Sequence, residues 1–115
     1  MTDRSARWLD LIVEDCARAQ ALVDRGRDAF DADPALPLAF EALANRIGGL
    51  AKRLAHDDPQ RFSEALWSIA AKNRDFIVHH YDVVDRDRLW LTVATDFPSV
   101  ADLARSKRGE SRLGD

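Results

Sequence analysis

The sequence predicts an all-α fold: a small up-and-down helical bundle of four main helices followed by a short C-terminal helix. Apolar residues recur three and four positions apart along most of the chain, and this is the period of an amphipathic helix. No segment shows the apolar–polar alternation of a half-buried strand. Proline and aspartate cluster between the periodic segments, where connections are expected.

The first helix is predicted over residues 3–30, and residues 31–37, which hold two prolines, form the connection after it. The apolar stripe of this helix comprises Leu9, Ile12, Val13, Cys16, Ala19 and Val23. The second helix carries a seam made of Phe40, Leu43, Ile47, Leu50 and Leu54. Gly48 and Gly49 interrupt it at a cost of about 1–2 kcal/mol in helix propensity. We therefore expect a neighbouring backbone to approach closely there.

The third helix is predicted to start at Pro59, with Asp58 as its N-cap, and to run to about residue 78. Asp85 should cap a fourth helix that reaches about residue 95, and Pro98 should open a short fifth helix. At 115 residues the chain has room for one core. We expect a single domain over residues 1–108 and a disordered tail over residues 109–115.

The charge and the cysteine content limit the function classes. The net charge is −3, which does not suggest a nonspecific nucleic-acid binder. Acidic residues gather near both ends, whereas basic residues lie in the central part, namely Arg46, Lys52, Arg53, Arg61, Lys72 and Arg74. Any RNA binding should therefore be confined to a cleft. The lone cysteine excludes an internal disulfide, and the sequence shows no signal peptide or membrane span. We expect a cytoplasmic protein.

The third helix ends in the most informative segment of the chain, which contains Arg74, His79 and Tyr81. Cleavage of RNA without a metal needs groups that move protons, and positive charge over the phosphate as it becomes five-coordinate. Histidine has an ordinary pKa near about 6.5, and arginine stays charged at every physiological pH. Arg74 and His79 can supply this chemistry.

The spacing Arg, four residues, His, one residue, Tyr resembles the signature of the HepT-like toxins, small helical ribonucleases of the HEPN class. The resemblance continues through Asp75, Trp90 and the step Phe97–Pro98. An acidic residue often follows the glycine of the second helix in that family, whereas Gly49 stands at that position here. We therefore assign no carboxylate role to that helix.

The resemblance implies a HEPN-like fold and a metal-independent endoribonuclease, the toxin of a toxin–antitoxin pair, with RNA, such as tRNA, as substrate. Arg74 and His79 would be catalytic, and Asn73, Asp75 and His80 would support them. The partner would be a nucleotidyltransferase antitoxin of the MNT type that adenylylates Tyr81. No cofactor and no metal are implied. The alternative is a non-catalytic helical subunit that partners a nucleotidyltransferase.

Each of these residues also has a purely structural interpretation. Arg74 could form a salt bridge with Asp75, and His79 could be an ordinary interior or surface histidine. Adjacent His79 and His80 diverge by about 100° on a helix, which is unsuited to a shared metal. Trp8, Trp67 and Trp90 are expected in the core or an interface. Ser63 and Ser68 lack a plausible partner base, and Cys16 lies on a core stripe, so no nucleophile is predicted.

The third helix has two apolar stripes, and one bundle core needs only one. One stripe contains Phe62, Leu66, Ile69 and Phe76, and the other contains Trp67, Ala70, Ala71, Val78 and, by spacing, Arg74. The second stripe must pack on another helix of the same chain or on another subunit. We favour a two-fold homodimer, in which Trp67, Ala71 and Val78 lose exposure. On an ideal helix Arg74 and His79 lie about 140° apart. Either the helix breaks before His79, or the site is assembled across the dimer.

Overall fold

The computed structural model describes residues 3–79 and 85–114, and within them the side chains of residues 4–76 and 85–110. Most of these residues are helical, and no strand occurs among them. The elements are α1 (Asp3–Val23), α2 (Arg27–Ala32), α3 (Ala35–Asp57), α4 (Ala65–His79), α5 (Arg86–Leu91), the π-helical segment η1 (Thr92–Asp96) and α6 (Phe97–Gly114). The predicted all-α bundle is confirmed.

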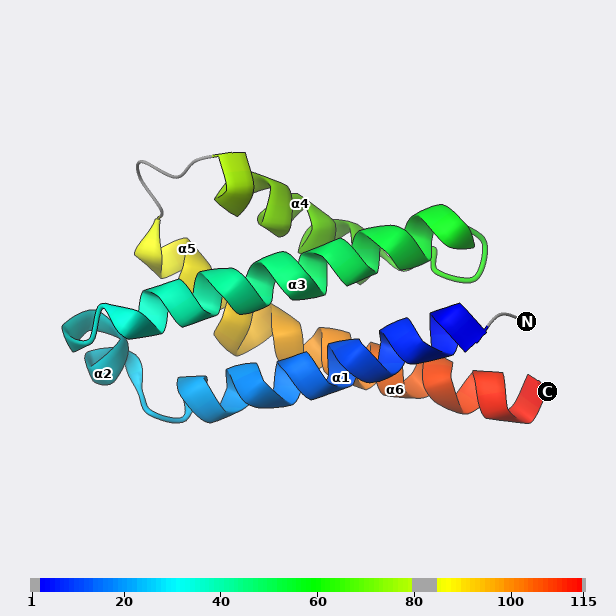
Figure 1. The fold of residues 1–115 in the computed structure, drawn as a ribbon, viewed down its shortest axis with the longest axis horizontal. Coiled ribbons are helices and arrows are strands. Elements are labelled where there is room, and N and C mark those ends of the chain that lie inside the picture. The colour runs from blue at the N-terminus through cyan, green and yellow to red at the C-terminus, as the bar shows by residue number, and fades with distance from the viewer. Residues whose placement is uncertain (1–2, 80–84, 115) are drawn as a thin grey trace.

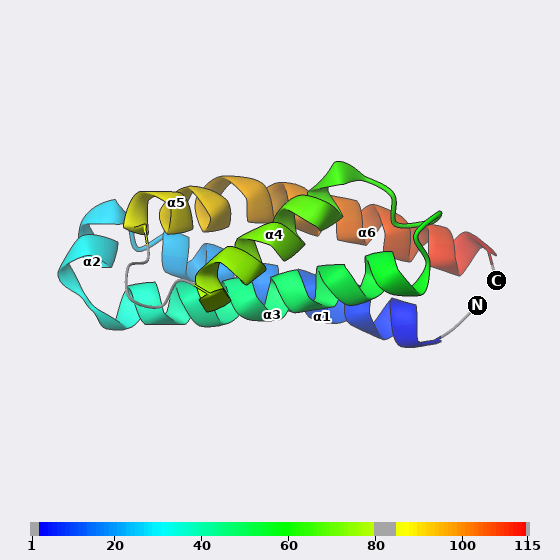
Figure 2. The same cartoon turned by 90° about the horizontal axis from the view of Figure 1, so that it is seen from above.

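The three long helices α1, α3 and α6 run side by side along the longest dimension of the molecule, 47 Å (Figure 1). The chain direction alternates from α1 to α3, α4 and α6, so the bundle is up-and-down. Seen from above, α4 lies obliquely over α3, and α1 begins at the same end of the molecule where α6 ends (Figure 2). Because α4 rests on α3, Arg74 of the sequence motif lies against α3.

The seam predicted on α3 forms the middle of the hydrophobic core. Phe40, Ile47 and Leu54 are fully buried, and Leu50 is nearly so. Leu9 and Ile12 of α1 face this seam and are fully buried as well. One apolar face on each helix therefore fills the interior, as amphipathic periodicity predicts.

The first predicted helix is in fact two helices, which corrects the expectation of one helix over residues 3–30. α1 ends at Val23, and Gly26 has a φ of 93°, a conformation that glycine adopts without steric cost. The short α2 that follows turns Phe30 inward, where its ring lies 4.8 Å from that of Phe40 and 5.3 Å from that of Trp90. The aromatic cluster explains why the chain turns back here.

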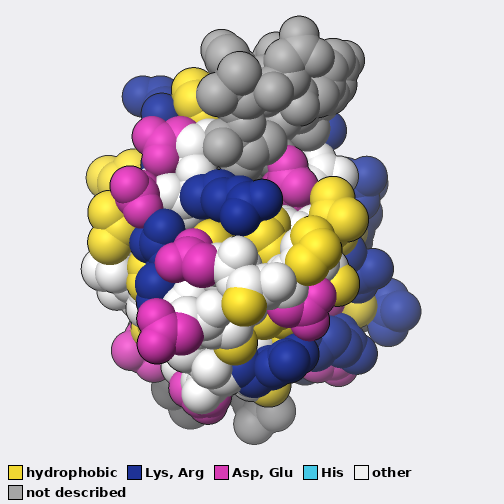
Figure 3. All heavy atoms as spheres, turned by 90° about the vertical axis from the view of Figure 1, so that its left-hand side faces the viewer, with side chains coloured by type: hydrophobic (Ala, Val, Ile, Leu, Met, Phe, Trp, Pro, Cys, Tyr) yellow, Lys and Arg dark blue, Asp and Glu magenta, His cyan; other side chains and the backbone are white. Residues whose placement is uncertain are grey.

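Acidic and basic side chains are mixed on the surface of this end of the bundle (Figure 3). Arg27 of α2 contributes to the pattern, since it pairs with Asp31 at 3.0 Å and with Asp87 of α5 at 2.6 Å. Hydrogen bonds to these two carboxylates raise the pKa of Arg27. The mixture gives this end no extended surface of a single charge.

The helix predicted to start at Pro59 begins six residues later, at Ala65. Asp58 does act as a cap, but of a turn: its Oδ1 accepts a hydrogen bond from the backbone N–H of Arg61 at 3.2 Å. The turn places Phe62 in the core, edge-on to Trp67. The Asp-Pro signal was therefore correct for a turn and wrong for the helix start, because burial of Phe62 competes with helix continuation.

Glu64 connects the start of α4 to α6. Its carboxylate accepts a hydrogen bond from Trp67 Nε1 at 2.9 Å and lies 2.6 Å from Lys107 Nζ. Partial burial alone would raise the pKa of Glu64, but the hydrogen bonds from Lys107 and Trp67 outweigh it and hold that pKa below its usual value.

The chain between α5 and α6 is continuous helix rather than a break. Asp85 caps α5 as predicted, since its side chain accepts from the Arg88 N–H at 3.1 Å. Pro98 cannot donate a hydrogen bond to the preceding turn. The π-helical segment η1 accommodates it, with the Phe97 N–H bonded to the Thr92 carbonyl. The C-terminal helix is therefore long, not short, and it runs to Gly114, past the predicted start of a tail at Gly109.

The two glycines of α3 differ in their surroundings. A Cβ at Gly48 would lie 2.6 Å from the Ala70 carbonyl oxygen and closer still to Cβ of Arg74. A Cβ at Gly49 would meet nothing within 4 Å. The predicted close approach of a neighbouring backbone is confirmed at Gly48, where α4 packs on α3, and is absent at Gly49.

We predict opposite effects of alanine at these two positions. Gly48→Ala should lower the free energy of unfolding by about 1–3 kcal/mol, because α4 must move away from α3. Gly49→Ala should raise it by about 0.5–1 kcal/mol, because alanine is the better helix former and finds open space. Urea denaturation of both variants beside wild type measures the difference. Equal effects of the two substitutions would contradict the close contact at Gly48.

Candidate active site

Arg74 is the motif residue whose side chain the structure describes. It projects from α4 onto α3, where its Nε donates to Asn45 Oδ1 at 3.1 Å. Its Nη1 donates to Asp75 Oδ1, also at 3.1 Å. The side chain is 32% exposed, and a guanidinium has five N–H donors, more than these two bonds use. Arg74 is thus oriented by two partners and still able to bind a ligand.

A pocket of about 330 Å³ adjoins Arg74 on the α3 side. Its walls come from α1, α3 and α4, and they are formed by Leu11, Asn45, Arg46, Gly49, Leu50, Arg53 and Arg74. Three of these residues are arginines and none is a carboxylate. The arrangement favours an anion, because three positive charges surround one cavity.

Two of the predicted supporting residues, Asp75 and Asn73, contact different elements. Asp75 pairs with Arg74 and lies 3.9 Å from Lys52 Nζ of α3. The salt bridge proposed as the structural interpretation of Arg74 therefore exists, but both partners are substantially exposed, so it contributes little stability. Asn73 is buried and accepts a hydrogen bond from Arg88 Nη2 at 3.2 Å, which ties α4 to α5.

The remaining motif residues lie outside the part that can be described. His80 and Tyr81 are outside the described residues, and so is the side chain of His79. The backbone of α4 is helical through His79. A helix break before His79 is therefore excluded, and positions 74 and 79 lie about 140° apart around α4.

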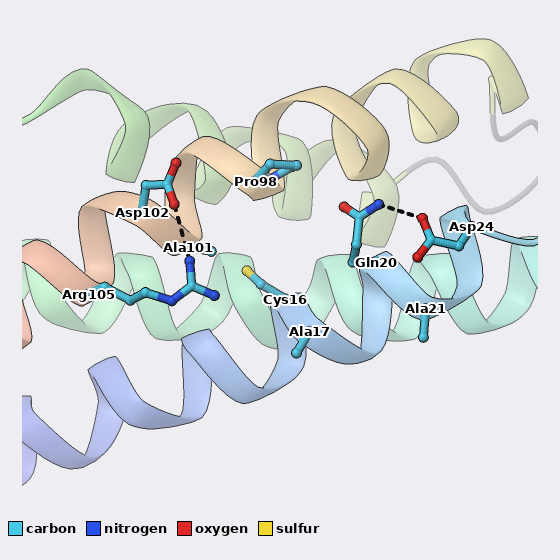
Figure 4. Close-up of a pocket in the computed structure, with 9 residues that line it drawn as sticks. All are labelled: Cys16, Ala17, Gln20, Ala21, Asp24, Pro98, Ala101, Asp102 and Arg105. Atoms are coloured by element: carbon cyan, nitrogen blue, oxygen red, sulfur yellow. Dashed lines mark hydrogen bonds and ion pairs between the residues drawn. The ribbon is translucent and has the colours of Figure 1, made fainter.

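A second pocket, of about 430 Å³, lies between α1 and α6 (Figure 4). Cys16 lines it, but burial, with a further contribution from Asp15, raises the pKa of this thiol to about 12. The acidic side chains there are occupied: Asp24 accepts from Gln20 at 2.9 Å and Asp102 accepts from Arg105 at 3.1 Å. A neutral thiol without a base cannot act as a nucleophile, as the sequence predicted.

Among the described residues, no three His, Cys, Asp or Glu side chains gather in a way that could hold a metal ion. The side chains of His79 and His80 lie outside those residues, so the prediction against a shared metal stays a prediction. In the same part of the chain, no helix is long and apolar enough to cross a membrane.

The tryptophans are structural, and one of them corrects the predicted dimer surface. Trp90 stacks on Phe40 with the ring centroids 5.8 Å apart, and Trp8 is partly buried against the core. Trp67 is only 1% exposed within a single chain. It therefore cannot lose exposure on association, and both Trp67 and Ala70 of its stripe are buried within the chain.

Asn45, Arg46, Arg53 and Gly49 were not predicted as site residues. Arg46 and Arg53 had been noted only as part of the central positive charge. Positions 46, 49 and 53 share one face of a helix, since they are three and seven residues apart. This spacing was the signal available in the sequence, but nothing in it showed that Arg74 faces the same side.

The fold and the pocket together define a small helical protein that presents a fixed arginine beside a cationic cavity, which suits binding of a phosphodiester. Residues 12–106 match the family described as "Ribonuclease HepT-like". The chain belongs to this family, and its biochemical class is endoribonuclease. The predicted family is thereby confirmed.

A relative from Caldanaerobacter subterraneus subsp. tengcongensis, named "Putative RNase TTE0752", is 27% identical over 97 residues. The similarity covers 81% of this chain and 84% of that protein. No solved structure matches the chain.

We predict that Cys16 is inert in the folded protein. A rise of its pKa from 9.0 to about 12 leaves about 10³-fold less thiolate at pH 8, and burial blocks access to it. A chromogenic thiol reagent should therefore react at the rate of unfolding, and rapidly once urea is added. Fast stoichiometric labelling of the native protein at pH 8 would contradict the buried position.

Proposed function

We propose that this protein is the metal-independent ribonuclease toxin of a toxin–antitoxin pair, with Arg74 and His79 as catalytic residues. The observation that carries the proposal is the position of Arg74: Asn45 and Asp75 orient it at the edge of a cationic pocket without carboxylates. Membership of the HepT-like family supports the ribonuclease activity. It also supports the role as a toxin, because this family generally occurs in toxin–antitoxin systems. We further propose that it acts in the cytoplasm, with tRNA as a candidate target.

The reaction follows from the substrate's own hydroxyl group. A base removes the proton of the ribose 2′-OH, whose oxygen then bonds to phosphorus as the bond from phosphorus to the 5′-oxygen breaks. An acid protonates that leaving oxygen, so the products are a 2′,3′-cyclic phosphate and a 5′-hydroxyl. His79 transfers the protons, and Arg74 stabilises the negative charge of the five-coordinate phosphorus.

The two residues are brought together across a homodimer in this proposal. The proposal is supported by helicity through His79, which separates positions 74 and 79 around α4. The surface for association is different from the predicted one, because Trp67 is buried. Ile69 of α4 and Leu91 of α5 are 42% and 59% exposed and line one depression together with Asn73 and Arg88. Burial of these two apolar side chains against a second copy would favour association.

The alternative, a non-catalytic subunit that partners a nucleotidyltransferase, needs Arg74 only as a structural residue. Its interactions argue against that use. The pair with Asp75 joins neighbouring residues of one helix, and the side chain opens onto a pocket instead of closing one. Asn45 holds Arg74 in place without neutralising its charge.

The first prediction for the proposed activity concerns cleavage. Arg74→Ala and His79→Ala should each lower the rate of RNA cleavage by at least about 10²-fold and abolish growth inhibition in cells. Cleavage by wild type should persist in EDTA and leave 2′,3′-cyclic phosphate ends. Arg105→Ala on α6 is the matched control, because it also removes one positive charge. Loss of cleavage in EDTA that added metal restores would refute the mechanism, and normal growth inhibition by His79→Ala would favour the non-catalytic subunit.

The second prediction concerns Tyr81 and the antitoxin. A phenol with a pKa near about 10 is a poor proton carrier at pH 7 but can accept an adenylyl group. Each attached group would add about one negative charge beside Arg74 and repel RNA. Tyr81→Phe should keep much of the cleavage and escape neutralisation. Mass spectrometry after co-expression with the nucleotidyltransferase should find adenylate on the Tyr81 peptide. If that peptide is unmodified and Tyr81→Phe is still neutralised, the adenylylation of Tyr81 is refuted. Simple occlusion of the active site by the partner then becomes the explanation of neutralisation.

The third prediction concerns the dimer. Ile69→Asp and Leu91→Asp should each weaken association by about tenfold or more, because a charge would be buried in the interface. Leu38→Asp is the control, since Leu38 is an exposed leucine on α3, 66% exposed, outside the depression lined by Ile69 and Leu91. Sedimentation velocity over a concentration series measures the shift. A wild-type protein that stays monomeric throughout would refute the homodimer.

A further inference from the structure

We propose that the pocket between α3 and α4 is a second phosphate-binding subsite, which holds the RNA backbone next to the scissile phosphate through Arg46 and Arg53. This inference rests on the proposed function, because Arg74 is the residue shared by the pocket and the reaction. The reaction itself does not require the rest of the RNA strand to be bound. The subsite would in addition give that part of the strand a defined path over α3.

Arg46 is oriented by a buried carboxylate. Its Nε donates to Oδ2 of Asp15 at 2.9 Å, and Asp15, which is 1% exposed, also accepts from Arg18 at 2.9 Å through its other oxygen. The bond with Asp15 raises the pKa of Arg46. Arg46 remains 57% exposed, so its Nε is held while the rest of the guanidinium faces the pocket and solvent. This geometry orients a cation in advance of binding, which lowers the entropic cost of the contact.

Arg53 lies two turns further along α3 on the same face. It is exposed, and among the described residues it has no carboxylate within ion-pair distance. Within the described part of the chain its charge is therefore not offset by an ion pair, in contrast to those of Arg46 and Arg74. An uncompensated arginine beside two oriented ones makes the pocket positive in a chain whose net charge is −3.

Gly49 lies between these two arginines and leaves the floor of the pocket open. A Cβ there would meet no atom within 4 Å, so the glycine is not required for helix packing. Its absence of a side chain instead exposes helix backbone to the pocket, where a phosphate can come close. Gly48, one residue earlier, serves the packing of α4.

The walls indicate what kind of ligand is bound. Among the described residues that line the pocket, Leu11 and Leu50 are apolar and none is aromatic, so none offers a ring on which a base could stack. Asn45, an amide in the wall, is already bonded to Arg74. The pocket therefore suits the backbone of a single strand and not its bases. It should add affinity without sequence preference.

Binding of an uncleavable strand tests the subsite separately from cleavage. Fluorescence anisotropy would follow fully 2′-O-methylated RNA oligonucleotides of two unrelated sequences, titrated with the intact protein at several salt concentrations. Arg53→Ala should lower the binding affinity for both oligonucleotides by the same factor. It should also reduce the slope of log K against log salt by about 0.7, the value for one lost phosphate contact on a single strand. Gly49→Leu should weaken both as well, by filling the pocket, with an unchanged circular dichroism spectrum.

Arg105→Ala is the matched control, because Arg105 has the same 57% exposure as Arg46 and lies on α6. It should leave the slope as in wild type. The subsite is refuted if Arg53→Ala changes the slope no more than Arg105→Ala does, or if Gly49→Leu binds like wild type. A loss of affinity that differs between the two oligonucleotide sequences would also refute the subsite. A further arm uses AMP: binding of AMP as tight as that of the strand, and equally dependent on Arg53, would identify a nucleotide site instead.

These outcomes separate the subsite from the proposed reaction. If the protein cleaves RNA as proposed but the slope is insensitive to Arg53, the subsite fails and the function stands. If Arg53 controls binding of the uncleavable strand but His79→Ala and wild type cleave RNA equally, the subsite stands and the catalytic assignment fails.

Discussion

The contact between α3 and α4 at Gly48 determines most of what the molecule can do. Without a side chain at Gly48, the Ala70 carbonyl and the Cβ of Arg74 rest directly on the α3 backbone. This contact fixes both the depth and the register of α4. The register in turn brings Arg74 Nε to Asn45 at 3.1 Å and places its guanidinium over the pocket. Stability and the candidate active site therefore share one contact, and a methyl group at this position would disturb both.

The parts of the fold that the sequence predicted correctly depend on local interactions. The seam through Ile47 and Leu54 and the cap at Asp85 follow from helical periodicity and from hydrogen bonds within one turn. The failures occurred where a distant contact competes with the local signal. Phe30 bends the first helix by joining Phe40 and Trp90, and Phe62 delays α4 by entering the core. Neither contact can be predicted from the local sequence around Phe30 or Phe62, because each partner lies elsewhere in the chain or depends on the packed core.

The same distinction applies to the candidate site. Arg74 could be predicted because its motif is contiguous in sequence, whereas Asn45 and Arg53 could not, because they reach Arg74 only through the packing of two helices. The favoured dimer surface at Trp67 was wrong for a related reason, and the other option, packing within the chain, holds for Trp67. α4 lies obliquely over α3 and also contacts α6, so the stripe of Trp67 is already used within the chain. The exposed side chain is Ile69, from the stripe that was assigned to the core.

The distribution of charge shows how an acidic protein can present a site for RNA. Two acidic side chains bind arginines of the pocket from behind or beside it: Asp15 holds Arg46 from the interior, and Asp75 holds Arg74 along the same helix. These carboxylates orient the guanidinium groups without entering the cavity. Their negative charge reduces the long-range field, so nonspecific attraction of RNA should be weak. Recognition then depends on a strand that fits against oriented donors at short range, where charge-assisted hydrogen bonds are strongest. A ribonuclease arranged in this way would select a strand by its fit at the cavity, independent of sequence, rather than by general attraction to polyanions.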